Sequence, residues 1–185
     1  MSKQIYTPVA NRGIPPFSFI EETVAAMKEL PDRLFQRNAD PDDIYDVVYP
    51  QLGPYAKDGQ FIPHRKACMC EVLRVLGGFE SSWNWSEDYD HSNANEDTLP
   101  EMSAGIFQIS YDSAREAELK MILHEWNIGT AKEFRRQMIV NHFFAIEYTV
   151  QLLRLNTKHN GPIKRREINP WLKRECVEEF LELLA

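Results

Sequence analysis

The sequence predicts a mainly α fold built as one domain. Apolar residues recur at three- and four-residue steps over several long segments, as they do along one face of an amphipathic helix. No segment alternates apolar and polar residues strongly enough to demand a sheet. A chain of 185 residues is also long enough to bury a full core without disulfide bonds.

Composition excludes several classes of function. The net charge of -7, with no basic tract, argues against a nucleic-acid partner held by phosphate contacts. No apolar run has the length of a signal peptide or of a membrane span, so we expect synthesis in the cytoplasm without a signal peptide. Three cysteines, Cys68, Cys70 and Cys176, do not make a disulfide framework, and we expect buried free thiols.

We expect residues 1–60 to form helices that pack, as an N-terminal extension, on the core of residues 61–185. Ser18, with a Glu three residues later, predicts a capping box that opens a helix ending near Leu30. Asp40 precedes a proline and predicts the start of a short helix that Pro50 ends.

A helix beginning near Pro63 carries the first candidate functional residue. Its apolar face is formed by Met69, Val72, Leu73 and Leu76. Glu80 continues this face near the helix end, where apolar neighbours and the negative end of the helix dipole both favour a protonated carboxyl. A carboxyl with a raised pKa can act as a general acid near neutral pH.

The remaining chain predicts three more helices. Ser110 or Asp112 caps the first of them. Thr130 begins a capping box before the longest helix, which runs to about Leu155 and is apolar around so much of its surface that we expect it to be central. Residues 169–184 predict a final amphipathic helix.

Residues 81–110 predict a long irregular segment between two helices. Connections of this length inside a compact domain are usually functional. A small hairpin between Trp83 and Gln108 is left open.

Three short motifs flank or follow this segment. They are Glu80-Ser81-Ser82-Trp83-Asn84, Ser103-Ala104-Gly105-Ile106-Phe107-Gln108-Ile109 and Lys158-His159-Asn160-Gly161-Pro162. Together they resemble the lytic transglycosylase and goose-type lysozyme family over roughly residues 67–162. The third motif departs from the family pattern, because His159 stands where Tyr is usual and the Asn-Gly spacing is closed.

The resemblance implies a single lysozyme-like helical domain in which residues 81–110 form the active-site loop. It implies that Glu80 is the catalytic acid, that Ser81 and Gln108 support the acid and the substrate, and that Trp83 packs in the core. The implied substrate is peptidoglycan, a chain of β-1,4-linked amino sugars.

Glycoside hydrolysis usually takes a second carboxylate, and the sequence leaves its identity open. We expect Asp88 or Asp90 if water is the nucleophile. Lytic transglycosylases need no second carboxylate, because the 6-hydroxyl of the sugar attacks and gives an anhydro product.

The sequence contains no complete pattern of metal ligands. Residues 88–92 alternate oxygen ligands, but Asn93 and Leu99 break an EF-hand pattern, so only a looser calcium site is left open. His64 and Cys68 have ligand-like spacing but lack the further ligands of a zinc site.

Aromatic and polar side chains near the loop are candidate sugar contacts. Gln108 can both donate and accept hydrogen bonds and so can hold an N-acetyl group. Tyr89 and Tyr111 offer rings that suit the C–H faces of sugars. The motif position also places His159 among the candidates for the cleft.

The function expected from these features is a muramidase that cleaves the bond between N-acetylmuramic acid and N-acetylglucosamine. Without an export signal, such an enzyme would reach the periplasm or cell wall as a phage lysin or as a secreted antibacterial effector, the latter with an immunity protein that occludes the cleft. The alternatives are a lytic transglycosylase, a chitin-directed hydrolase, and a non-catalytic glycan-binding or phage structural protein.

Overall fold

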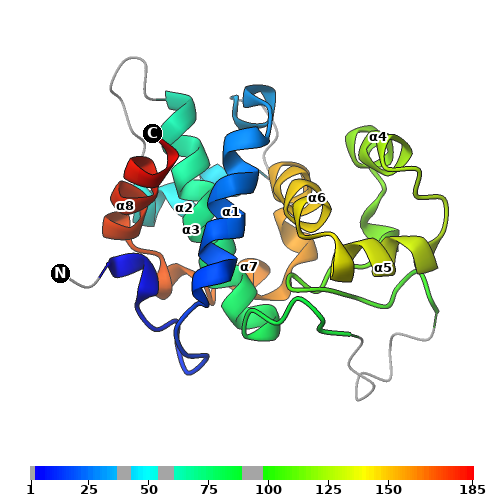
Figure 1. Cartoon of the computed structure of the whole chain (residues 1–185), viewed down its shortest axis with the longest axis horizontal. Helices are drawn as coiled ribbons and strands as arrows, with labels where there is room; N and C mark the ends of the chain where they lie inside the picture. Colours follow the sequence, from blue (N-terminus) through cyan, green and yellow to red (C-terminus); the bar gives the residue numbers. More distant parts are fainter. Residues whose placement is uncertain (1–2, 37–42, 54–60, 89–97) are drawn as a thin grey trace.

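The computed structural model describes residues 3–36, 43–53, 61–88 and 98–185, and these residues are mainly helical (Figure 1). The helices are α1 (Phe17–Glu29), α2 (Ile44–Leu52), α3 (Phe61–Ser81), α4 (Ala117–Glu125), α5 (Ala131–Val140), α6 (His142–Leu155), α7 (Gly161–Lys164) and α8 (Arg174–Leu184). Short 3-10 turns are η1 (Gln4–Tyr6), η2 (Asp32–Phe35), η3 (Tyr111–Ser113), η4 (Thr157–His159) and η5 (Asn169–Trp171). The mainly α class is confirmed.

The central helix is α3, which carries Glu80. Every residue from 67 to 78 is buried, and α1 and α8 pack along its sides while α7 packs on it as well (Figure 1). The helix ending at Leu155 was expected to be the longest and central; it is not the longest, since α3 has 21 residues, although α6 does pack against α1, α2, α4 and α5. That helix is also shorter than expected, because the chain breaks at Asn141 into α5 and α6.

Asn141 causes this break through its side chain. Its Oδ1 accepts a hydrogen bond from the backbone N–H of Phe144 (3.1 Å), which makes Asn141 the N-cap of α6. Its extended backbone (φ −117°, ψ 91°) cannot continue α5. An Asn side chain that bonds to nearby backbone competes with helix continuation, and apolar periodicity gives no sign of this.

Several helix ends also differ from the expectation. Pro16, not Ser18, precedes the first residue of α1, and no side chain caps it. Asp43 caps α2, while Asp40 lies outside the described residues. α2 continues past Pro50 and ends at Leu52, because the next residue, Gly53, has a φ of 77° that cannot continue the helix.

Two further starts can be compared with the structure. Neither expected cap starts α4, which begins at Ala117: Ser110 precedes η3 and Asp112 lies within it. The capping box at Thr130 is confirmed, because its hydroxyl accepts from Glu133 N–H and the Glu133 carboxylate accepts from Thr130 N–H.

The N-terminal segment shares one core with the rest of the chain. The ring of Phe19 on α1 lies 6.4 Å from that of Phe107, and the backbone N–H groups of Gln4 and Ile5 donate to Glu179 on α8. The proposed boundary between an extension and residues 61–185 stays a prediction.

Candidate active site

The site is built around Glu80, the penultimate residue of α3. The helix ends there because Ser82 and Trp83 adopt left-handed backbone conformations, with φ of 53° and 60°. Their N–H groups still reach back to the carbonyls of Gly78 and Gly77, at 3.1 and 3.0 Å. The otherwise free carbonyls at this helix end are thus partly satisfied.

Two glycines allow this ending. The indole of Trp83 folds back over α3, and its Nε1 donates to the carbonyl of Arg74 (2.8 Å). A Cβ on Gly78 would lie only 2.8 Å from the Trp83 ring, and one on Gly77 would lie 3.2 Å from it. Trp83 is 5% exposed, so it packs in the core as expected.

Ser81 joins the end of α3 to the second motif. Its hydroxyl donates to the carbonyl of Ile106 (2.9 Å) and accepts from the N–H of Asn84 (3.1 Å). The sequence nominated Ser81 as a support for acid and substrate, and the structure shows it holding two backbone segments of the site together.

The second motif forms a tight turn closed by a single β-bridge between Ala104 and Ile109. This bridge is the one piece of β pairing in the described parts of the chain. Gly105 (φ 73°) is required in the turn, because a Cβ there would lie 2.5 Å from the carbonyl oxygen of Met138. The hairpin left open between Trp83 and Gln108 is not seen in the described part of that span, and residues 89–97 lie outside the described residues.

Gln108 is oriented inside this turn. Its Nε2 donates to the carbonyl of Gly105 (2.9 Å), and its Oε1 accepts from the hydroxyl of Ser103 (3.2 Å). The side chain is half-buried. Its role towards a sugar stays a prediction.

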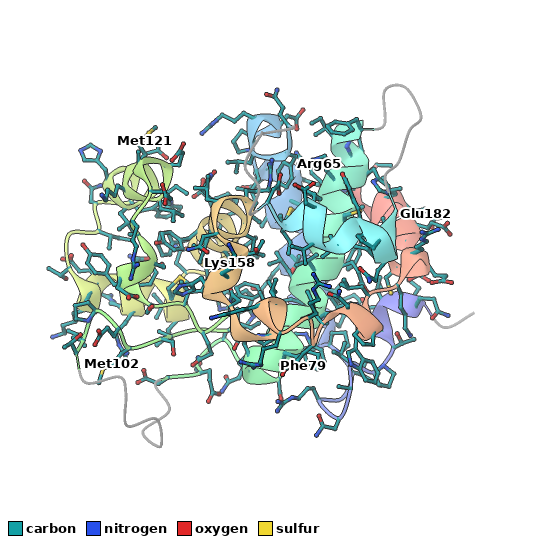
Figure 2. The ribbon with its side chains drawn as sticks, turned by 180° about the vertical axis from the view of Figure 1, so that it is seen from behind. Arg65, Phe79, Met102, Met121, Lys158 and Glu182 are labelled. Carbon is teal, nitrogen blue, oxygen red and sulfur yellow. The ribbon has the colours of Figure 1, made fainter. Side chains whose placement is uncertain are left out.

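Asn160 connects the third motif to Glu80. Its Nδ2 lies 3.5 Å from Oε1 of Glu80 and 3.4 Å from the carbonyl oxygen of Phe107. Asn160 is 2% exposed, and its own side-chain oxygen has no hydrogen-bond partner among the described residues. One amide therefore joins α3, the turn of the second motif and the segment leading into α7. Figure 2 shows α7 beside the end of α3, where Phe79 is labelled.

The environment of Glu80 favours its protonated form. Burial raises the pKa of Glu80 to about 7, and the Asn160 amide and the Arg165 charge oppose part of that rise. Glu167 raises the pKa further, whereas Arg12 lowers it. The C-terminal end of a helix adds a negative potential of the same sign as the burial effect.

Of the two candidate bases, Asp88 is paired with a residue of α5 and Asp90 lies outside the described residues. Asp88 is exposed and forms an ion pair with Arg135 on α5, whose guanidinium also donates to the carbonyl of Ser103 (3.4 Å). Tyr89 and Asp90 lie outside the described residues, as do residues 91–92 of the loop considered for calcium.

Tyr111 and His159, the other two candidates for sugar contacts among the described residues, form no hydrogen bond with Glu80. Tyr111 packs edge-on against Phe134, with ring centroids 5.8 Å apart, and its hydroxyl lies 3.4 Å from the Gly129 carbonyl. His159 is half-buried, and burial lowers its pKa, while the charges of Asp112 and Arg115 act on it in opposite directions. The residue of the third motif that contacts Glu80 is thus Asn160, whereas the residue predicted from the sequence was the adjacent His159.

Asn160 was missed because an Asn before Gly-Pro reads first as a turn residue. Its place in the third motif was the available signal. Only the packing of α7 against the end of α3 brings its amide to the carboxyl of Glu80.

No metal site is found within residues 3–36, 43–53, 61–88 and 98–185, where no three His, Cys, Asp or Glu side chains gather. His64 instead lies against Cys68, with Nδ1 3.6 Å from Sγ. The cysteines are free and buried, as expected. In the same parts of the chain no helix has the length and apolar character to cross a membrane.

Comparisons with protein-family models, with curated proteins and with solved structures each find no match to this chain. What the site can do is therefore inferred from its own residues.

Proposed function

We propose that this protein is a lysozyme-like glycosidase that cleaves the β-1,4 bond of peptidoglycan glycan strands. The observation that supports this most is Glu80 itself, a half-buried carboxyl at a helix end with a pKa raised to about 7 and an amide 3.5 Å away. Such a group is substantially protonated at neutral pH and still acidic enough to give its proton to a leaving group.

In the proposed reaction, Glu80 donates its proton to the glycosidic oxygen as the bond to the anomeric carbon breaks. The carboxylate that remains faces the Nδ2 group of Asn160 and the positive charges of Arg12 and Arg165. These groups stabilise the negative charge that appears on Glu80 during the step.

The proposal has two versions, which differ in the group that attacks the anomeric carbon: water or the 6-hydroxyl of the sugar. In the hydrolytic version, Asp88 or Asp90 activates water. In the lytic version, Glu80 takes the proton of the sugar 6-hydroxyl and an anhydro product forms. Within the hydrolytic version, the ion pair between Asp88 and Arg135 favours Asp90 as the base, because it commits the Asp88 carboxylate to α5.

One cation near Glu80 favours peptidoglycan over chitin. Arg12 and Arg165 both act electrostatically on Glu80, but Arg165 is paired with Glu167 (2.8 Å), which leaves the exposed Arg12. The lactyl and peptide carboxylates of muramic acid units give peptidoglycan negative charges that neutral chitin lacks. Delivery as a phage lysin or an antibacterial effector, and occlusion by an immunity protein, belong to the same proposal.

Mass spectrometry of products released from peptidoglycan sacculi tests this function. Wild-type protein, Glu80→Gln and the control Glu101→Gln, an exposed carboxylate in the segment before the second motif, are incubated with sacculi and with chitin. Hydrolysis is supported if the wild type and Glu101→Gln release reducing-end muropeptides and Glu80→Gln does not. Anhydro products, lighter by one water, support the lytic version.

Three results would count against the proposal. Release of sugar from chitin but not from sacculi would overturn the substrate. Equal rates for wild type and Glu80→Gln would overturn the role of Glu80. Sacculi that bind the protein but release nothing would favour the non-catalytic glycan-binding alternative.

A further inference from the structure

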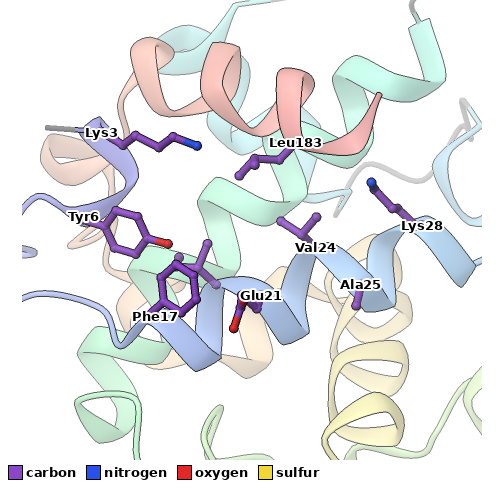
Figure 3. Close-up of a pocket in the computed structure, with 9 residues that line it drawn as sticks. Lys3, Tyr6, Phe17, Glu21, Val24, Ala25, Lys28 and Leu183 are labelled. Carbon is purple, nitrogen blue, oxygen red and sulfur yellow. The ribbon is translucent and has the colours of Figure 1, made fainter. Parts of the chain in front are cut away.

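A concave site lies between α1 and the C-terminal end of α8 (Figure 3). It has a volume of about 480 Å³, which is in the size range of small-molecule sites. We call it the α1 groove, and it is lined by Lys3, Tyr6, Phe17, Ile20, Glu21, Val24, Ala25, Lys28 and Leu183.

The α1 groove is mainly apolar, and Glu21 is the one carboxylate among the described residues that line it. Six of its residues come from one stripe of α1 between Phe17 and Lys28, a distance of roughly 16 Å along the helix. Phe17 is 62% exposed and stacks on Tyr6, with ring centroids 5.9 Å apart. Leu183 points into the groove from α8 (Figure 3). An exposed apolar trough of this kind is suited to an apolar chain.

Positive charges stand at the two ends of this trough. Figure 3 shows Lys3 at one end and Lys28 at the other, with both ammonium groups directed towards the space between α1 and α8. Neither side chain forms an ion pair with another described residue. On a chain with a net charge of -7, two such cations beside apolar side chains are complementary to an anionic amphiphile.

The two ends differ in their neighbouring carboxylates. At the Lys3 end, Glu179 holds the N–H groups of Gln4 and Ile5, and Glu21 and Glu179 both act electrostatically on Tyr6. An added anion would be repelled there. Lys28 lies seven residues, about 10 Å, beyond Glu21 along α1, so its end is the less repulsive one.

We propose that the α1 groove binds a medium-chain carboxylate as a single molecule, with the apolar chain along α1 and the carboxylate at Lys28. The chain removes the exposed surface of Phe17, Val24 and Leu183 from water, and Lys28 fixes its direction. The groove residues do not include Glu80 or its contacts, so the inference stands apart from the proposed glycosidase activity.

The test is an NMR titration of the isotope-labelled protein with dodecanoate, kept below its micelle concentration. Dodecylammonium, of the same length and opposite charge, is the comparison ligand. We expect saturable amide shifts at Val24, Ala25 and Leu183 with dodecanoate, and binding of dodecylammonium about tenfold weaker, as expected for losing one charge pair and gaining repulsion.

Variants assign the end that holds the carboxylate. We expect Lys28→Glu to weaken dodecanoate binding about tenfold and Lys3→Glu by about twofold or less. Lys120→Glu, the same charge change on the exposed face of α4, is the matched control and should leave binding unchanged. Phe17→Ala should weaken both amphiphiles, because it removes part of the apolar wall. Thermal unfolding of each variant verifies that it is folded.

Several outcomes would overturn the inference. They are shifts that do not saturate, shifts that map away from α1 and α8, and equal affinity for the two amphiphiles. A larger effect of Lys3→Glu than of Lys28→Glu would overturn the assigned direction. Binding only above the micelle concentration would indicate a membrane-like surface as the true partner and reject a single bound molecule.

Discussion

At the scale of single residues, the raised pKa of Glu80 links activity to stability. Burial raises this pKa to about 7 from the usual value near 4.5. The protonated acid is therefore abundant below pH 7 and is lost as the pH rises through about 7. We expect the rate of glycan cleavage to fall over the same pH range, and a plot of initial rate against pH measures this.

The same group makes folding stability depend on pH with a defined sign. Between about pH 4.5 and 7 the folded state binds more protons at Glu80 than the unfolded chain does, so stability falls as the pH rises. We expect Glu80→Gln to exceed wild type by about 2 kcal/mol at about pH 8 and to match it at about pH 4. Urea unfolding at both pH values measures this.

The control for this prediction is Glu125→Gln, an exposed carboxyl at the end of α4. It should follow the wild-type pH dependence. A Glu80→Gln protein that also followed the wild-type curve would show that the carboxyl of Glu80 is solvated.

A substitution at Gly105 should also have a large effect on stability. Gly105→Ala combines a left-handed backbone (φ 73°) with a Cβ only 2.5 Å from the Met138 carbonyl oxygen. We expect a loss of about 3 kcal/mol in unfolding free energy. Gly129→Ala, where the nearest atom to the new Cβ is 3.9 Å away, should change stability by less than about 0.5 kcal/mol. Similar losses for both variants would mean that the turn adjusts freely.

At the scale of elements, the capping box fixes the start of α5. Thr130→Ala removes the hydroxyl that accepts from Glu133 N–H (3.2 Å), and we expect a loss of about 1 kcal/mol. Thr130→Ser keeps the hydroxyl and should stay within about 0.5 kcal/mol of wild type. Chemical denaturation measures both, and equal losses would show that the methyl group of Thr130, and not the cap, contributes the stability.

The packing of elements also explains why the site forms where it does. α3 ends at Ser81 because Trp83 folds back over Gly78, and α7 then lies against that end. Three segments that are distant in sequence therefore meet at the side-chain amide of Asn160. Apolar periodicity predicted α3 and its face, and the placement of Asn160 depended on the packing of α7.

At the scale of the whole molecule, a buried ion pair in α3 joins the two ends of the chain. Arg74 Nε lies 2.6 Å from a Glu71 oxygen, and both side chains are fully buried. Arg74 also donates to the carbonyls of Thr7 and Trp171, and Glu71 accepts from the N–H of Lys173 (2.9 Å). The pair thus satisfies backbone groups from the N-terminal and C-terminal segments.

Removing one partner of this pair should destabilise the entire fold. We expect Arg74→Met to cost about 3 to 5 kcal/mol, because Glu71 would be left buried without its cation. Arg115→Met breaks the exposed pair with Asp112 and should cost less than about 1 kcal/mol. Urea denaturation compares them. A small loss for Arg74→Met would mean that water reaches Glu71 in the variant.

The sequence by itself determined the mainly α class, the extent of α3, the capping box at Thr130 and the position of Glu80 on an apolar helix face. These features depend on local spacing and on side chains a few residues apart. Tertiary structure alone decided that α3 is central, that Asn160 faces Glu80, that Asp88 pairs with Arg135, and that α1 and α8 leave a groove between them. The reason is that burial and contact between distant segments depend on how helices pack, and one-dimensional periodicity fixes the face of a helix but not its neighbour.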